Sequence, residues 1–174
     1  MRNILLCCSL CLFTLLCGCR AEPDWETVDD DAVLQVSAEV EPPYIITYGI
    51  PDDASMEPLS ARNRSLYVGE NGDYEILTDA LSAASLDDAI HQISGFGEKD
   101  LSILETTRFG LPEYRFAWAS SSDEGEFVSQ ASLVQDGDYY YALVFSVRQG
   151  LGGKYDDCAE AVFSSFGLDG DENF

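Results

Sequence analysis

The chain has 174 residues, of which 46% are hydrophobic and 24% are charged, a length that suits one domain with its own core. Acidic residues outnumber basic ones by 32 to 9, so the formal net charge is −23 at pH 7. Binding to nucleic acid needs a basic stripe, and the only clustered cations are Arg62 and Arg64. The composition therefore argues against nucleic acid as a partner.

The first 18 residues predict a secretory signal. Arg2 is the only charge ahead of the apolar residues 4–16, a run shorter than the about 20 residues that a membrane-spanning helix needs. The run closes on Leu16-Cys17-Gly18-Cys19, the kind of box at which bacteria cleave a signal and lipidate the following cysteine. We expect lipidation of Cys19, which anchors the protein on the extracytoplasmic face of the cell membrane. The alternative is an ordinary signal peptide with a chance cysteine.

Removal of this leader changes the cysteine count and the charge. Five of the six cysteines lie in the leader or at its edge, so Cys158 has no partner for an internal disulfide. It falls on the apolar side of a predicted helix, which indicates an inert, buried thiol. Loss of Arg2 leaves eight basic residues against 32 acidic ones, a formal charge of −24. Such a charge repels an anionic bilayer and favours cationic partners, although a merely solvated surface explains it as well.

The mature part divides into three segments. Residues 19–31 predict an acidic tether, because Trp25 and Val28 are their only sizeable apolar residues. Residues 32–168 contain no long linker or repeat and predict a single domain. Residues 169–174 predict a flexible acidic tail.

Strand signals follow one another through this domain. Asn71-Gly72 and Asp136-Gly137 predict two tight turns between strands. The predicted strands are residues 33–38, 44–50, 66–69, 74–78, 101–107, 113–119, 127–135 and 138–147. The last of these is apolar on both faces, which predicts a central strand that is covered on both sides.

Two helices interrupt the strands. Ser85, with Asp88 three residues later, predicts a capping box at the start of the first helix, and Gly95 predicts its end. The second helix is predicted over residues 154–166, where apolar side chains recur at helical spacing. Runs of strands with segregated helices predict an α+β domain, with an antiparallel sheet of about six or seven strands sandwiched by two helices.

Three stretches make this order of elements more specific. They are Leu111-Pro112-Glu113-Tyr114-Arg115-Phe116, Gln135-Asp136-Gly137-Asp138-Tyr139-Tyr140-Tyr141-Ala142-Leu143-Val144-Phe145 and Val162-Phe163-Ser164-Ser165-Phe166. Together with the pattern of elements they resemble the PsbP-like lipoproteins of bacteria. The resemblance implies an antiparallel sheet between helical layers and no activity, because a fold does not fix a function.

No catalytic residue is predicted. His91 is the only histidine and is expected on a helix surface, and no serine, including Ser120-Ser121-Ser122, lies in a Gly-x-Ser-x-Gly elbow. The carboxylates of Asp123, Glu124 and Glu126 are candidates for acid and base work on glycans. They belong to a Ser- and Gly-rich loop, where solvation leaves the pKa of a carboxyl near normal, whereas a catalytic acid needs a pKa raised by burial.

No metal or cofactor is predicted either. Zinc would need several Cys or His ligands, and neither Glu70-Asn71-Gly72-Asp73-Tyr74-Glu75 nor Asp169-Gly170-Asp171-Glu172 completes a calcium loop. The glycines Gly150, Gly152 and Gly153 lack the spacing of a phosphate loop and predict a turn. Tyr139-Tyr140-Tyr141 could line a ligand pocket, but in a central strand we expect them in the core.

Two functions remain. The first is a lipid-anchored, extracytoplasmic, non-enzymatic module that binds or assembles with an envelope protein or a small ligand, and it is favoured because no site chemistry is found. The alternative is a hydrolase of envelope polymers or glycans that uses paired carboxylates. A hydrolase should show a cleft with two facing carboxyl groups, whereas a module should show a shallow apolar patch rimmed by polar groups.

Overall fold

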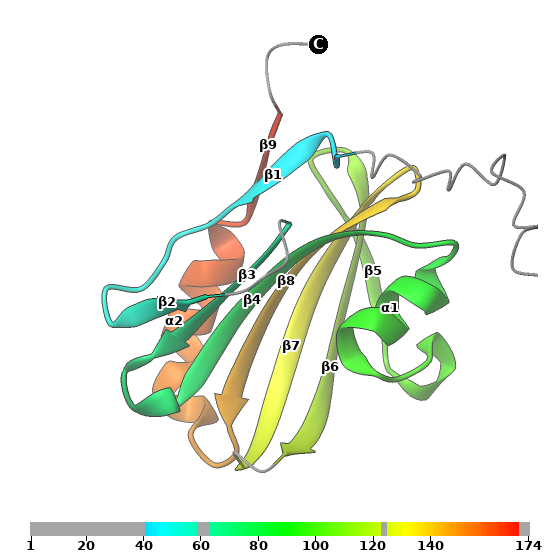
Figure 1. The fold of residues 1–174 in the computed structure, drawn as a ribbon. Helices are drawn as coiled ribbons and strands as arrows, with labels where there is room; N and C mark the ends of the chain where they lie inside the picture. Colours follow the sequence, from blue (N-terminus) through cyan, green and yellow to red (C-terminus); the bar gives the residue numbers. More distant parts are fainter. Residues whose placement is uncertain (1–40, 59–62, 123–124, 171–174) are drawn as a thin grey trace, which may run out of the picture. The chain divides into compact units, whose positions relative to one another are not determined.

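The computed structural model describes residues 41–58, 63–122 and 125–170, which belong to one compact unit (Figure 1). The predicted signal sequence, Cys19, the predicted tether and the predicted strand 33–38 lie outside the described residues. The expectations for them therefore stay predictions. No helix within the described ranges has the length and apolar character needed to cross a membrane.

Seven strands form one antiparallel sheet in the order β2-β3-β4-β8-β7-β6-β5. They are β2 Ala54–Glu57, β3 Arg64–Gly69, β4 Tyr74–Ser82, β5 Leu104–Arg108, β6 Leu111–Ser122, β7 Gly125–Asp136 and β8 Tyr139–Arg148. A second antiparallel pair consists of β1 Tyr44–Thr47 and β9 Gly167–Gly170. The helices are α1 Leu86–Ser94 and α2 Gly152–Ser164, with short 3-10 turns η1 Glu70–Gly72 and η2 Glu98–Asp100.

The predicted α+β class is confirmed, and the two helices lie on opposite faces of the sheet (Figure 1). β8 is the middle strand of the seven. Its odd-numbered residues, such as Tyr141 and Phe145, pack in one core cluster with α2, and its even-numbered residues, such as Tyr140 and Val144, pack in the other with α1. The prediction that both faces of this strand are buried is therefore confirmed.

The ends of α1 follow the sequence closely. The Ser85 hydroxyl accepts a hydrogen bond from the Asp88 amide at 3.2 Å, and Gly95 ends the helix at a φ of 79°. The return bond of the predicted capping box is different: the Asp88 carboxylate accepts from the amide of Ala84, at 3.2 Å, instead of from that of Ser85. His91 lies exposed on this helix, as expected.

Two short strands and several element boundaries differ from the predictions. The strands predicted over residues 44–50 and 101–107 are shorter, at Tyr44–Thr47 and Leu104–Arg108, and the second helix ends at Ser164 instead of at residue 166. β2 and β9 are not foreseen, because four residues with few apolar side chains give no periodic signal. β9 pairs with β1, Leu168 opposite Ile46, and continues to Gly170, past the predicted end of the domain. Gly152 and Gly153 are the first residues of α2, so the turn predicted at these glycines is wrong there.

Gly69 is required where β3 ends, because the ring of Tyr74 lies directly over it. A Cβ at this position would be 2.6 Å from Cδ1 of Tyr74, and Tyr74 is fully buried and stacked on Phe145 at 5.3 Å. The ring has no space into which it could retreat.

We expect Gly69→Ala to lower the free energy of unfolding by about 2 kcal/mol or more, through overpacking. Urea unfolding measures the change. The matched control is Gly153→Ala, where no heavy atom lies within 4 Å of the added Cβ. That substitution should be neutral or stabilising, since alanine favours a helix over glycine by about 1 kcal/mol. Equal effects at the two positions would contradict the close approach.

Candidate functional site

α2 covers only part of one face of the main sheet. Its buried side chains, Val162 and Phe163 among them, cluster with residues of β4 and β8 and with Val134 of β7. Since alternate residues of a strand share a face, the pairing register places further side chains of β5, β6 and β7 on this same face. We call the exposed ones the open face: Leu104, Thr106, Arg115, Ala117, Ala119, Ser121, Glu126, Val128 and Gln130.

A groove runs between α2 and the open face. One part has a volume of about 410 Å³ and reaches Phe163 and Ser164, and the other has a volume of about 200 Å³ and reaches Gly152 and Tyr155. Both parts are lined by Gln130, Asp156 and Ala159, so they are continuous. The α2 residues that line it recur every three or four positions, which puts them on one side of the helix: Tyr155, Asp156, Ala159, Glu160 and Phe163.

Three of the charged groups that line this groove, Arg115, Asp156 and Glu160, make no hydrogen bond or ion pair within the described part of the chain, whereas Arg108 pairs with Glu113 and Arg148 donates to the Gly72 carbonyl. The guanidinium of Arg115 lies 5.9 Å from the centre of the Phe163 ring, and it makes no hydrogen bond or ion pair with a described residue. The same holds for the carboxylates of Asp156 and Glu160, which are exposed on α2. A ligand can therefore satisfy these groups without breaking contacts that hold the fold together.

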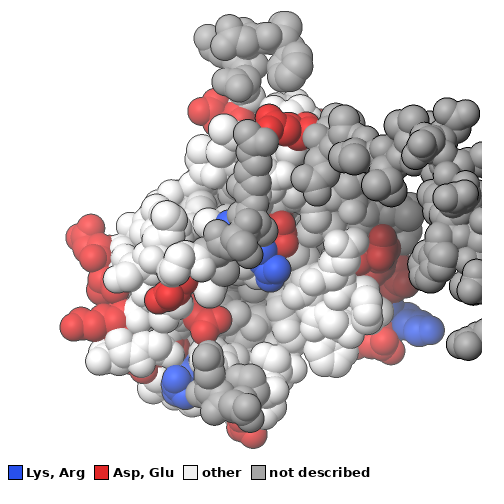
Figure 2. Space-filling view, in the orientation of Figure 1, with Lys and Arg blue, Asp and Glu red and all other residues white. Residues whose placement is uncertain are grey.

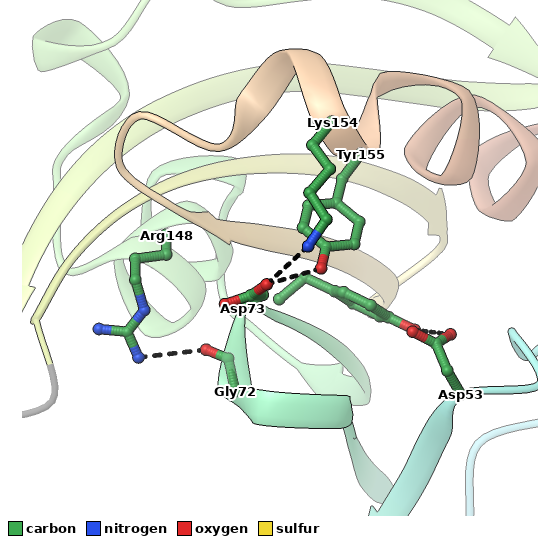
Figure 3. Close-up of polar contacts among 7 residues, drawn as sticks. Asp53, Gly72, Asp73, Arg148, Lys154 and Tyr155 are labelled. Carbon is green, nitrogen blue, oxygen red and sulfur yellow. Dashed lines mark hydrogen bonds and ion pairs between the residues drawn. The ribbon is translucent and has the colours of Figure 1, made fainter.

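A polar cluster fixes the N-terminal end of α2 (Figure 3). Asp73, which follows η1, accepts hydrogen bonds from Lys154 Nζ at 2.9 Å and from the Tyr155 hydroxyl at 2.8 Å. These bonds hold the pKa of the Asp73 carboxyl below its ordinary value, the bond from Lys154 most strongly. Contacts with Tyr155 and Asp73 raise the pKa of Lys154. Because Tyr155 also lines the groove, this cluster sets the position of the groove wall.

Tyr74 completes the packing at this end. Its hydroxyl donates to Asp53 Oδ1 at 2.7 Å, and its ring contacts those of Phe145, at 5.3 Å between centres, and Tyr155, at 5.0 Å. Burial raises the pKa of Tyr74, and the bond to Asp53 raises it further. The pKa of Cys158 is also raised by burial, so its thiol stays protonated and is no activated nucleophile. Cys158 is half-buried against the α2 core cluster, in accord with the inert thiol that the sequence indicates.

A second polar cluster fixes the other end of α2. Arg108 Nε pairs with Glu113 Oε1 at 2.8 Å, and Arg108 Nη1 donates to the carbonyl of Phe166 at 3.2 Å. Glu113 is only 4% exposed, and it also accepts from the Ser132 hydroxyl at 2.6 Å. The buried Glu113 carboxylate thus has hydrogen-bond partners from β5 and β7, and the Arg108 guanidinium also links β5 to Phe166, which follows α2.

This network was not predicted from the sequence, although one signal for it is present. Glu113 belongs to a strand whose alternation puts it on the same face as Arg115 and Ala117. Reading β5 and β6 as a hairpin would have brought Arg108 close to Glu113. The open face and its groove had no such signal, because they depend on where α2 docks.

The residues that the sequence singled out do not form a site. His91 makes no side-chain hydrogen bond with a described residue, and Glu126 is exposed beside the β6–β7 turn, while Asp123 and Glu124 lie outside the described residues. Tyr140 and Tyr141 are core residues, and burial raises the pKa of Tyr141 to about 12. Within the ranges described, no group of three or more His, Cys, Asp or Glu is placed to hold a metal ion.

A second cleft, of about 420 Å³, lies between β1 and the β3–β4 hairpin. Its described cation, Arg64, is already paired with Asp79 at 3.6 Å. The cleft adjoins residues 59–62, which lie outside the described residues. The groove beside α2 is the stronger candidate, because three of its charged groups lack an ion pair with any described residue and because it is built from described elements.

Comparison with known proteins supports the fold and no more. No family model and no curated protein matches the chain. The structure of cyanobacterial PsbP (CyanoP) from Synechocystis sp. PCC 6803 matches with a TM-score of 0.53 and 9% identity, over 72% of this chain and 87% of that one. This likeness confirms a PsbP-like fold. At 9% identity it carries no information on activity.

Two further structures match less well. A crystal structure from Bacteroides thetaiotaomicron VPI-5482 has a TM-score of 0.48 and 14% identity over 74% of this chain, which spans only 46% of that protein. LpqN of Mycobacterium tuberculosis, described as involved in cell envelope biogenesis, has a TM-score of 0.46 and 14% identity over 75% of this chain and 87% of its own. No argument rests on either match.

The Arg108–Glu113 pair gives a test of the second cluster. We expect Arg108→Met to lower the free energy of unfolding by about 3 kcal/mol, because it leaves the Glu113 carboxylate buried without its cation. The double variant R108M/E113Q should cost less than the single one, since glutamine is neutral and still accepts from Ser132. Urea unfolding of both variants measures the two changes in the free energy of unfolding. A single-variant loss below about 1 kcal/mol would show that Glu113 is solvated.

The Asp73 cluster gives a test in pH. The folded-state pKa of Asp73 lies below its unfolded value, so its contribution is fully present above about pH 4 and is lost as the pH falls through the folded value. The stability difference between the wild type and Asp73→Asn should thus be largest near neutral pH and shrink in acid. Urea unfolding at several pH values measures it. Asp157→Asn, an exposed control on α2, should change the free energy of unfolding at neutral pH by less than about 0.5 kcal/mol.

Proposed function

We propose that the protein is a lipid-anchored, non-enzymatic module outside the cytoplasm, which binds a segment of a partner protein in the groove beside α2. The observation that carries the proposal is the groove itself, in which Arg115, Asp156 and Glu160 have no ion pair with any described residue and surround an exposed floor. Polar clusters at both ends of α2 hold its wall in place. A preformed groove of this kind lowers the entropy cost of binding.

The arrangement of the carboxylates favours binding over hydrolysis. Asp156 and Glu160 lie one helical turn apart on the same wall, whereas the two carboxyl groups of a glycosidase flank the bond from opposite sides. The wall opposite them carries Arg115 and Gln130. The candidate carboxylate Glu126 lies exposed at a hairpin and outside this groove.

The place of the protein in the cell is proposed from its sequence. The Leu16-Cys17-Gly18-Cys19 box supports lipidation of Cys19, and the acidic residues that follow support a tether between the lipid and the domain. The domain would then present its groove to proteins of the envelope. Mass spectrometry of protein from its native host tests the anchor, because an unmodified Cys19 would remove this part of the proposal.

The groove is tested by blocking its floor. A photoreactive residue at Gln130 should crosslink a partner in the native membrane, which mass spectrometry identifies. Binding of that purified partner should then weaken at least about tenfold in Val128→Glu, because Val128 is a floor residue with 38% of its surface exposed. The matched control is His91→Glu, on the exposed side of α1 and across the sheet from the groove. Equal affinities for the two variants would contradict the proposed site.

A further inference from the structure

We infer that the occupant of the groove is a basic, amphipathic helix that lies on the open face beside α2, an inference that rests on the function proposed above. The width of the open face supports a helix. Three strands, β5, β6 and β7, contribute to it, and at a spacing of about 4.8 Å they span roughly 10–14 Å, the diameter of a helix with its side chains. α2 covers the neighbouring part of the same face in the same way.

The backbone of the occupant also favours a helix. An extended segment lying flat on a sheet face cannot use the strand ladder, so it would bury backbone N–H and C=O groups without partners. A helix satisfies these groups internally and offers one apolar stripe. The floor fits such a stripe, because Ala117 and Ala119 allow close approach while Leu104, which is 62% exposed, and Val128 supply apolar surface.

The charges indicate that the flank next to α2 is basic. Asp156 and Glu160 stand along that wall, unpaired within the described residues, and one turn apart they can receive lysine or arginine side chains from a parallel helix. The whole chain, with a formal charge of −23, attracts the same partner over longer distances, and Figure 2 shows acidic side chains scattered over the face drawn there. Three arginines of the described ranges also line the groove. Arg108 is neutralised by Glu113 and Arg148 donates to the carbonyl of Gly72, so on the sheet side Arg115 offers a contact to one acidic side chain of the occupant.

The probe for this inference is a synthetic amphipathic peptide of about 14 residues, roughly the length of α2, with Leu and Ala at i, i+3, i+4 and i+7 and Lys elsewhere. One comparison peptide replaces Lys by Glu, and another scrambles the Lys peptide so that no apolar stripe forms. Binding to the full chain is followed by fluorescence anisotropy at physiological salt, and helix formation by circular dichroism. We expect the basic amphipathic peptide to bind, to gain helicity, and to bind at least about tenfold more tightly than either comparison.

The wall residues give the matched variants. The double variant D156N/E160Q should weaken binding of the basic peptide roughly five- to tenfold, as expected for two exposed ion pairs. Asp157→Asn removes the same charge from the next residue of α2, outside the groove, and should change affinity less than about twofold. All three positions are exposed, and unfolding curves verify that the variants fold.

The outcomes separate this inference from the proposed function. Equal binding of the Glu peptide, or an equal effect of Asp157→Asn, overturns the basic occupant, and binding without a gain in helicity overturns the helix. If Val128→Glu blocks the native partner while the basic peptide fails to bind, the inference falls and the proposed groove stands. If Val128→Glu also has no effect on the native partner, both fall.

Discussion

β8 lies in the middle of the main sheet, and apolar side chains are buried on both of its faces. Tyr141, Leu143 and Phe145 face α2, whereas Tyr140, Ala142 and Val144 face α1. Since apolar surface contributes about 25 cal/mol for each Å² removed from water, a strand of this kind is stable only with a helical layer on each side. The positions of both helices, and with them the two core clusters, follow from this one requirement.

Because α2 must cover β8, its position also determines which part of this sheet face stays exposed. A helix is about 10 Å wide and a seven-stranded sheet is about three times wider, so α2 covers only part of the sheet face on which it lies. It packs over β4 and β8, beside the apolar β1–β9 pair, and the outer part of β5, β6 and β7 stays open. The groove is the boundary between these two regions, and its shape depends on where the helix sits.

Polar contacts refine the position of α2 at each end. At the N-terminal end, Asp73 binds Lys154 and Tyr155, and at the other end Arg108 binds the carbonyl of Phe166 while it neutralises Glu113. The two clusters differ in kind, because the first is exposed to solvent and the second contains a carboxylate that is almost fully buried. An exposed ion pair adds little to stability and mainly favours one side-chain geometry. A buried carboxylate, in contrast, strongly destabilises the fold when its cation is removed. Two of the cations of this acidic chain, Lys154 and Arg108, thus position α2.

Local chemistry made much of the fold predictable from the sequence alone. The Ser85 cap, the Gly95 stop, the Asn71-Gly72 and Asp136-Gly137 turns and the two-faced strand at β8 each depend on neighbours in sequence, so the α+β class and the central strand followed from them. The tertiary structure alone decided β2 and β9, whose pairing partners lie far away in the chain or offer little apolar pattern, and the meeting of Arg108, Glu113 and Ser132. It also decided the groove, because Arg115, Val128 and Asp156 come from three separate elements. Side chains from separate elements become neighbours only through strand register and helix docking, and no local pattern encodes either of these.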